Sequence, residues 1–385
     1  MPEQNGNHER RRYILFALAL LVIASAGAYG TWWHVWGRYE ATTDDAYVNG
    51  NVVSLSPRVS GTVISINADD TDLVHAGDVV VRLDDSDANI AFAQAQADLA
   101  QTVRQVQQLF DEAAQAQASL VLQKASLAQA ERDYKRAQEL SKINGISTEG
   151  LQHAGTALET ARAAYTETSH RLAASKAAVD GTEIATHPRV LAAEAQLRRA
   201  WLALQRTRVR APVGGYVAKR SVQVGQQVQP GAVLMAIIPL QQVWVDANFK
   251  ETDLAHVRIG QPVTLTADLY GTGHRYGGKV TGLAAGTGNA FALLPAQNAT
   301  GNWIKVVQRL PVRIGLDPGT LKDFPLRIGL SMSVDIDTHD LHGQTLAESA
   351  VNGPRFSTSV YNLDETAVNN LIDKIVRQNV RTTSQ

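Results

Sequence analysis

A seven-residue spacing of apolar side chains runs between residues 92 and 134 of this 385-residue chain. The first row comprises Phe92, Leu99, Val106, Ala113, Leu120, Leu127 and Tyr134. The second row, three residues later in each heptad, comprises Ala95, Thr102, Leu109, Ala116, Gln123, Ala130 and Ala137. Two such rows form the narrow seam of a coiled coil, and the alanines allow a partner helix to approach closely. The pattern therefore predicts a long helix paired along one narrow face.

The partner of this helix is predicted in the segment that follows. Its row comprises Leu151, Leu158, Tyr165, Leu172 and Val179, and after a shift of four residues Val190, Leu197 and Leu204. The shift coincides with residues 180–182 and 187–188, where glycine and proline predict an interruption of the helix. Residues 142–146 are too few for anything except a reversal, so we expect one antiparallel hairpin. An ordinary pair of bundle helices is the alternative, but such helices average about 11 residues.

An internal repeat flanks the predicted hairpin. An offset of 154 residues relates Gly61 to Gly215, Val63 to Val217, Val74 to Val228, Gly77 to Gly231 and Leu83 to Ile237. A constant offset indicates one motif used twice. Each copy consists of short valine-rich strands separated by glycines and could bury little apolar surface alone. The two halves are therefore predicted to close on each other as a small β-sandwich.

The repeat resembles the split biotinyl-lipoyl half-motifs of periplasmic adaptor proteins, which are also called membrane fusion proteins. An authentic carrier domain would present a modifiable lysine on the turn between its halves. Here the first copy continues into residues 84–87, which are Asp-Asp-Ser-Asp. We therefore expect a structural sandwich that carries no cofactor, with a carrier domain as the alternative.

The N-terminal segment has the pattern of a membrane anchor. Residues 13–33 contain no charged side chain and would span the ~30 Å hydrocarbon layer as a helix. The arginines at 10–12 predict a cytoplasmic N-terminus, and Trp32, Trp33 and Trp36 would form an aromatic belt at the far interface. A cleaved signal peptide is the alternative, because residues 24–26 resemble a processing site. The absence of cysteine excludes an acylated lipoprotein anchor.

The last third of the chain is predicted to form a small β-barrel. Its expected strands are 243–249, 263–267, 278–280, 303–307, 312–314 and 333–336. Segments 248–253, 286–291 and 302–311 resemble the barrel of EmrA-type adaptors, a subgroup of the HlyD family. An apolar stripe formed by Val368, Leu371, Ile372, Ile375 and Val376 predicts a short amphipathic helix in the tail. We expect this helix to pack against the barrel, with docking on a transporter as the alternative.

Three residues near the predicted reversal match a signature that the resemblance supplies. Arg136, Leu140 and Ser147 have the types and spacing of the Arg-x3-Leu-x6-Ser pattern at the hairpin tips of adaptors that meet a TolC-like outer-membrane channel. The resemblance implies that they bind this partner. Arg136 could instead be a solvated charge and Ser147 a helix N-cap. Leu140 lies four residues after Arg136, on a common helix face beside the seam.

Composition and motifs argue against catalysis and nucleic-acid binding. A net charge of −1 excludes a strongly basic nucleic-acid binder, and 44% hydrophobic residues exclude a wholly disordered chain. The histidines are scattered, and no nucleophile elbow, P-loop or dinucleotide fingerprint occurs. We therefore expect no enzyme, no catalytic residues, no metal site and no cofactor.

Together these patterns predict a multidomain α+β chain with a transmembrane helix, a split biotinyl-lipoyl-like sandwich, a long antiparallel coiled-coil hairpin and a small barrel. The expected divisions are a cytoplasmic N-terminus at 1–12, an anchor at 13–36, half-motifs at 44–85 and 207–240, the hairpin at 86–206, the barrel at 241–338 and a tail at 339–385.

The resemblance implies the adaptor of a tripartite multidrug efflux pump in the inner membrane of a Gram-negative bacterium, with most of the chain in the periplasm. Its expected partners are an EmrB-like major-facilitator drug/proton antiporter, a TolC-like channel and further copies of itself, and no nucleic acid. The alternatives are a type I secretion adaptor that exports polypeptide and a coiled-coil scaffold with no transport role.

Overall fold

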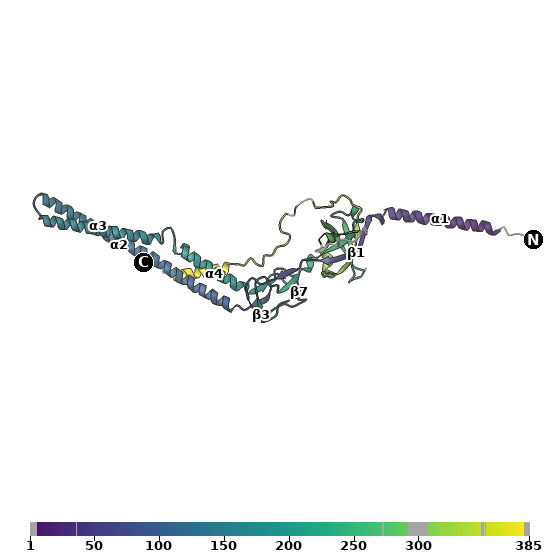
Figure 1. The fold of residues 1–385 in the computed structure, drawn as a ribbon, viewed down its shortest axis with the longest axis horizontal. Helices are drawn as coiled ribbons and strands as arrows, with labels where there is room; N and C mark the ends of the chain where they lie inside the picture. Colours follow the sequence, from purple (N-terminus) through teal and green to yellow (C-terminus); the bar gives the residue numbers. More distant parts are fainter. Residues whose placement is uncertain are drawn as a thin grey trace, which may run out of the picture.

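A computed structural model describes residues 6–35, 37–271, 273–291, 307–347, 350 and 352–380. The molecule is elongated, and its parts follow one another along the long axis (Figure 1). A single helix lies at one end, followed by a β-barrel, a β-sandwich and a helical hairpin. The predicted fold class, a mixture of helix and sheet in several domains, is confirmed. The residue numbers of the predicted divisions remain a prediction.

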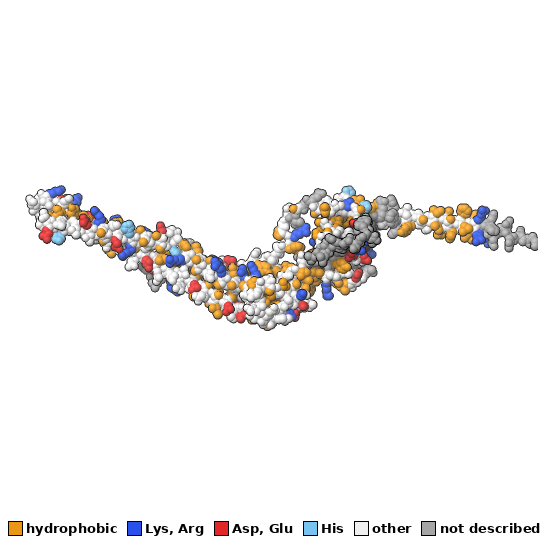
Figure 2. Space-filling model, viewed as in Figure 1, with side chains coloured by type: hydrophobic (Ala, Val, Ile, Leu, Met, Phe, Trp, Pro, Cys, Tyr) orange, Lys and Arg blue, Asp and Glu red, His pale blue; other side chains and the backbone are white. Residues whose placement is uncertain are grey.

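Helix α1, Gly6–Val35, contains the apolar N-terminal run. Its segment Arg10–Thr31 has a mean hydropathy of 2.0, and none of it is buried. Length and composition therefore suit it to crossing a membrane. In Figure 2 apolar side chains are spread along this helix, and Lys or Arg side chains gather at its N-terminal end. Of the predicted aromatic belt, Trp36 and the side chains of Trp32 and Trp33 lie outside the described parts of the structure.

The barrel is closed and antiparallel. Its strands in order around the barrel are β1 (Glu40–Asn49), β10 (Trp244–Lys250), β13 (Arg309–Leu316), β12 (Arg275–Leu283), β11 (Pro262–Ala267) and β14 (Ser331–Asp337). Short helices η3 (Leu240–Gln242), η4 (Leu254–His256), η5 (Gly288–Phe291) and α5 (Pro318–Asp323) lie between them. Phe249, Leu265, Tyr276 and Ile314 are among the side chains that fill its core.

Strand β1 differs from the prediction. Its residues were expected partly in the first half of the sandwich, and a segment at 303–307 was expected in the barrel. Instead β1 closes the barrel between β10 and β14, while residues 303–306 lie outside the described structure. The inward positions of β1 are small or medium side chains, Ala41, Ala46 and Val48, and a register shift between Thr43 and Ala46 interrupts the alternation. The strand pattern was therefore weak in the sequence.

The sandwich consists of two four-stranded sheets, and each sheet combines strands from both halves of the repeat. One sheet has the order β2 (Val53–Leu55), β9 (Met235–Ile238), β7 (Gly215–Arg220) and β4 (Leu73–Val74). The other has the order β6 (Arg208–Arg210), β5 (Val79–Leu83), β3 (Gly61–Ile66) and β8 (Gln227–Val228).

The repeat offset is visible as a symmetry of strand pairing. The pair β2–β9 corresponds to β6–β5, and the pair β3–β8 corresponds to β7–β4. Each half therefore supplies edge partners to the other half, and their apolar faces form one core with Leu55, Leu83, Leu234 and Ile237 inside. Neither half has these partners by itself, which explains why the motif occurs twice.

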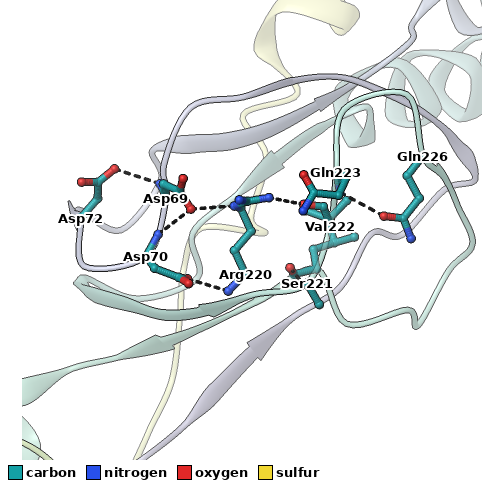
Figure 3. A network of polar contacts seen from close by, with 9 residues as sticks. Asp69, Asp70, Asp72, Arg220, Ser221, Val222, Gln223 and Gln226 are labelled. Carbon is teal, nitrogen blue, oxygen red and sulfur yellow. Dashed lines mark hydrogen bonds and ion pairs between the residues drawn. The ribbon is translucent and has the colours of Figure 1, made fainter.

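A polar network reinforces the contact between the two halves of the sandwich (Figure 3). The Nε of Arg220 donates to Asp69 at 2.6 Å, and the backbone N–H of Arg220 donates to the Asp70 carboxylate at 2.7 Å. The Nη1 of Arg220 donates to the carbonyl of Val222 at 2.6 Å. Since Asp69 and Asp70 precede β4 and Arg220 ends β7, one side chain connects segments from both halves of the repeat.

The hairpin consists of α2 (Ser86–Lys142), α3 (Thr148–Ala177) and α4 (Pro188–Arg206), with the short helix η2 (Ile184–Thr186) at the predicted interruption. Helix α2 has 57 residues and rises roughly 85 Å. At the interruption Pro188 occupies the first turn of α4, and the Nδ1 of His187 accepts from the N–H of Arg189 at 3.2 Å. The predicted reversal and interruption are both present.

Seam burial decreases toward the tip. Near the sandwich Leu99 and Val106 are fully buried, whereas farther out the buried seam residues of α2 are the alanines Ala113, Ala116 and Ala137. Larger row members such as Leu127 remain half-buried. The outer hairpin is therefore a thin two-helix rod held by close packing of small side chains.

Helix α6, Thr366–Asn379, packs against the hairpin base and not against the barrel, so the expected barrel contact was wrong. In Figure 1 the yellow C-terminal segment lies beside α4. Val368, Ile372 and Val376 join a core that includes Leu99 and Leu197. The side chain of Arg104 on α2 also donates to Asn379, and that of Arg198 on α4 donates to Asn369. The inner hairpin is therefore a three-helix bundle.

Candidate partner-binding site

The hairpin tip is the part of the molecule farthest from α1 (Figure 1). At the reversal the N–H of Gly145 donates to the carbonyl of Leu140 at 2.8 Å, and the N–H of Asn144 donates to Ser141 at 3.2 Å. Asn144 adopts a left-handed backbone conformation with φ of 54°, which asparagine tolerates better than most residues. These bonds satisfy carbonyls at the end of α2 that would otherwise lack partners.

Ser147 is the N-cap of α3. Its backbone is extended, and its Oγ accepts from the N–H of Gly150 at 3.1 Å. This is the capping role that the sequence offered as an alternative to partner binding. The residue is exposed, and its hydroxyl can still donate a hydrogen bond to a partner while its oxygen accepts the capping bond.

Arg136 and Leu140 lie one turn apart at the end of α2. The side chain of Arg136 is 70% exposed, and its Nη1 is 3.5 Å from Asp133. A surface pair of this kind contributes little to stability, so the guanidinium is available for another acceptor. Leu140 is 38% exposed, and next to it Ile143 is 74% exposed. The tip thus presents apolar side chains beside a cation and a hydroxyl.

Two features of the tip were not predicted from the sequence. Ile143 is more exposed than Leu140 and lies in the turn itself. An open groove also runs beside the tip, lined by Tyr134, Thr148, Leu151, Gln152, Gly155, Thr156 and Glu159. A Cβ at Gly155 would lie 3.5 Å from the Tyr134 ring, at ordinary van der Waals distance, so the glycine faces the groove without being required by it. A glycine within a heptad pattern was the available signal.

The described parts of the chain contain no group of three or more histidine, aspartate or glutamate side chains that could hold a metal ion. The tip presents the exposed apolar side chains Leu140 and Ile143 beside the guanidinium of Arg136 and the hydroxyl of Ser147.

Comparison with known proteins identifies relatives both of the hairpin and of the whole chain. Residues 86–207 match a family model described as "EMRA, alpha-helical hairpin domain". The chain is 46% identical to the multidrug export protein EmrA of Haemophilus influenzae over 97% of this chain and 96% of that protein. It is 48% identical to EmrA of Escherichia coli over 92% of this chain and 91% of that protein. It is also 48% identical to the fatty acid resistance protein FarA of Neisseria gonorrhoeae, over 87% and 85% of the two chains.

Solved structures with similar chains include the periplasmic adaptor protein EmrA, with 19% identity and a TM-score of 0.40 over 78% of this chain and 99% of that one. Another is MacA from Actinobacillus actinomycetemcomitans, with 20% identity and a TM-score of 0.43 over 77% and 78% of the two chains.

An apolar helix, a closed barrel, a split sandwich and a long hairpin define the class of membrane fusion proteins, which are periplasmic adaptors. With 46% identity over nearly its whole length, the chain belongs to the EmrA family of adaptors in multidrug efflux. The family and the apolar helix fit a protein anchored in the inner membrane with most of its mass in the periplasm.

Proposed function

We propose that this chain is the adaptor of a tripartite multidrug efflux pump, connecting an EmrB-like major-facilitator drug/proton antiporter to a TolC-like outer-membrane channel. The observation that carries the proposal is that α1 and the hairpin tip lie at opposite ends of the molecule (Figure 1). One chain can therefore be anchored in one membrane and reach toward another. Helix α2 alone supplies roughly 85 Å of that reach.

In this proposal the N-terminus is cytoplasmic, and the barrel, sandwich and hairpin are periplasmic. The chain transfers no chemical group, and the proton gradient used by the antiporter supplies the energy. Several copies surround one channel, since a single thin rod cannot enclose a conduit. The relatives named for multidrug export support efflux over secretion of polypeptides.

Arg136, Leu140 and Ser147 are the proposed channel contacts. Arg136 offers donors to carbonyl or carboxylate oxygens, Leu140 offers exposed apolar area, and Ser147 offers a hydroxyl donor. All three lie in the last turns of α2 or at the start of α3, so they can meet one partner surface at the same time.

Cysteine cross-linking tests the proposal, because the native chain contains no cysteine. Ile143→Cys places a thiol on an exposed tip position, and Gln117→Cys places one on the exposed side of α2 far from the tip. In cells that produce the antiporter and the channel, we expect the tip thiol to cross-link to a cysteine at the periplasmic end of the channel. The Gln117→Cys chain should not cross-link.

Equal cross-linking from both positions, or none from Ile143→Cys, would contradict the proposed tip contact. Affinity purification of the full chain after cross-linking then identifies the transporter. Recovery of an ATP-driven transporter in place of a major-facilitator protein would favour the secretion adaptor, and recovery of no transporter would favour the scaffold.

A further inference from the structure

The hairpin is connected to the sandwich by two short links. Residues 84–85 lead from β5 to α2, and Thr207 leads from α4 to β6. The N–H of Leu83 donates to the carbonyl of Thr207 at 2.9 Å, so the two links lie side by side. Two adjacent links act as a hinge, about which the hairpin could rotate as a rigid body.

The apolar cores on the two sides of this hinge are separate. The sandwich core includes Leu83 and Val209, and the hairpin core includes Leu99 and Leu197. Within the described structure the two cores share no residue. Domains that lack a large apolar interface move relative to each other by default. Another contact is therefore needed to fix the angle of the hairpin.

The C-terminal tail supplies a third connection across the hinge. The hydroxyl of Thr358 donates to the carbonyl of Pro212, between β6 and β7, at 2.6 Å. The ring of Tyr361 lies 5.2 Å from the guanidinium of Arg58, which is in the segment between β2 and β3. Both contacts attach the tail to the sandwich. Two residues later, Leu363 packs against the core of the hairpin base.

The tail between these attachments, residues 358–366, is named the strap. The N–H of Asn362 donates to the carbonyl of Ser359 at 2.9 Å and closes a turn. The N–H of Thr366, the first residue of α6, donates to the carboxylate of Asp364 at 2.9 Å. The strap is therefore short and internally hydrogen-bonded, which leaves little slack between the sandwich and α6.

The attachment of α6 to the hairpin lies away from the hinge. Val368, Ile372 and Val376 pack in the same core as Leu99, which is about 20 Å along α2 from its first residue. Two adjacent links permit rotation about one axis, and a third attachment away from that axis opposes it.

We propose that the strap locks the angle between the hairpin and the sandwich, with α6 as its point of attachment to the hairpin. The lock controls where the tip points, because α2 is roughly 85 Å long and a rotation of about 15° at its base displaces the tip by about 20 Å. It belongs to the chain itself and does not depend on which transporter or channel the adaptor contacts.

Pulsed electron–electron resonance between two spin labels measures the distribution of distances across the hinge. The native chain contains no cysteine, so labels attach only at Lys219→Cys on β7 and Gln117→Cys on α2, which are both exposed positions. The full chain is measured in nanodiscs of zwitterionic lipid, and dilution with unlabelled chain removes distances between copies. We expect a single narrow distribution when the strap is native.

Lengthening the strap tests the lock. Insertion of Gly-Ser-Gly-Ser between Leu363 and Asp364 adds about 13 Å of slack and leaves the sequence of α6 unchanged. We expect the distance distribution to broaden by about 10 Å, because Gln117 lies roughly 45 Å along α2 from the hinge. The control has the same insertion between Asn352 and Gly353, which precede the strap, and should keep the native distribution.

A second variant removes the strap's contacts with the sandwich and leaves its length unchanged. Thr358→Val with Tyr361→Ala should broaden the distribution as the insertion in the strap does. Hydrogen exchange of residues 366–379 in the same samples shows whether α6 stays on the hairpin. We expect native protection of α6 in both variants and in the control.

Three results would overturn the proposal. A native distribution in the chain with the lengthened strap would show that the hinge is fixed without it. Equal broadening by the control insertion would show that the effect is not specific to the strap. Broadening that occurs only where α6 loses its protection would assign the lock to the packing of α6 and not to the strap.

Discussion

Glycine is required at the repeat positions for two different structural reasons. The positions are Gly61 with Gly215 and Gly77 with Gly231. Gly77 and Gly231 have φ of 94° and 87°, a left-handed conformation that side chains disfavour. Gly61 and Gly215 are not left-handed, and they permit close approach instead. A Cβ at Gly215 would lie 2.4 Å from the carbonyl oxygen of Ile238. Both copies of the motif therefore have glycine at the same two positions. At Gly77 and Gly231 the turn requires it, and at Gly61 and Gly215 close packing requires it.

Gly215→Ala should destabilise the sandwich, because the added methyl would meet backbone atoms that cannot rotate away. Overpacking of this kind costs about 1–3 kcal/mol. Gly214→Ala is the matched control, since a Cβ there would lie no closer than 3.6 Å to any atom and the backbone is not left-handed. Thermal unfolding of both variants checks the prediction, and equal midpoints would refute it.

Arg136→Asp and Leu140→Ser should each reduce drug resistance and channel cross-linking while the hairpin stays folded. Each change removes an exposed group from the proposed contact, and loss of an important contact residue weakens binding by about tenfold or more. Arg162→Asp makes the same charge change at an exposed position on α3 away from the tip and should have no effect. Unchanged resistance in both tip variants would remove the assignment.

Arg220→Gln should weaken the contact between the sandwich halves in a pH-dependent way. The hydrogen bond from Arg220, with smaller help from the backbone N–H of Asp70, lowers the pKa of Asp69. A lowered folded pKa adds stability above the unfolded value of about 3.9, and this stability is lost as the pH falls through the folded value. The backbone amides of β4 should therefore exchange hydrogen faster in the variant than in the native chain at pH 7.

That difference should shrink as the pH falls below about 4. Lys219→Gln is the neighbouring control, because Lys219 is exposed and precedes Arg220 on β7. A difference that persists unchanged in acid would show that Arg220 acts through packing and its bond to Val222, and not through the carboxylate of Asp69.

At the scale of elements, α6 shows how one local pattern can be compatible with several partners. Its apolar stripe was visible in the sequence, but the surface it covers belongs to α2 and α4, far away along the chain. Val103 lies outside both heptad rows of α2 and is fully buried. An apolar residue at this position indicates that the inner part of α2 has a wider apolar face than a two-helix seam requires. This was the signal in the sequence for a third helix.

Ile372→Ala should loosen the docking of α6. Ile372 is 2% exposed in the three-helix core, and truncation of a buried isoleucine typically costs about 2–5 kcal/mol. Hydrogen exchange should rise through 366–379 and leave the hairpin tip unchanged. Asn370→Ala changes an exposed position on the same helix and should leave exchange as in the native chain. If α6 remains as well protected from exchange after Ile372→Ala as in the native chain, burial of Ile372 is not what holds α6 on the hairpin.

At the scale of the whole molecule, the proposed function depends on length. Deleting residues 117–123 and 167–173 removes one heptad from each arm and shortens the rod by roughly 10 Å while the seam keeps its period. We expect drug resistance to fall to the level of a strain without the chain, as measured by growth in the presence of drug. Such a variant should still form the barrel and the sandwich.

The length control replaces residues 117–123 with a second copy of residues 124–130, which changes the sequence of α2 but not its length. This variant should retain resistance. If the shortened chain also retains resistance, reach is not what the hairpin supplies.

The sequence by itself determined the features that depend on short-range periodicity and on the repeat. Heptad spacing, the reversal at 142–146, the interruption before Pro188 and the pairing of Gly61 with Gly215 all follow from residues near one another or from a constant offset. Tertiary structure alone decided that β1 closes the barrel and that α6 packs on the hairpin base. Those placements bring together segments from distant parts of the chain. The local pattern of a short polar strand or a single amphipathic helix does not specify which distant segment it packs against.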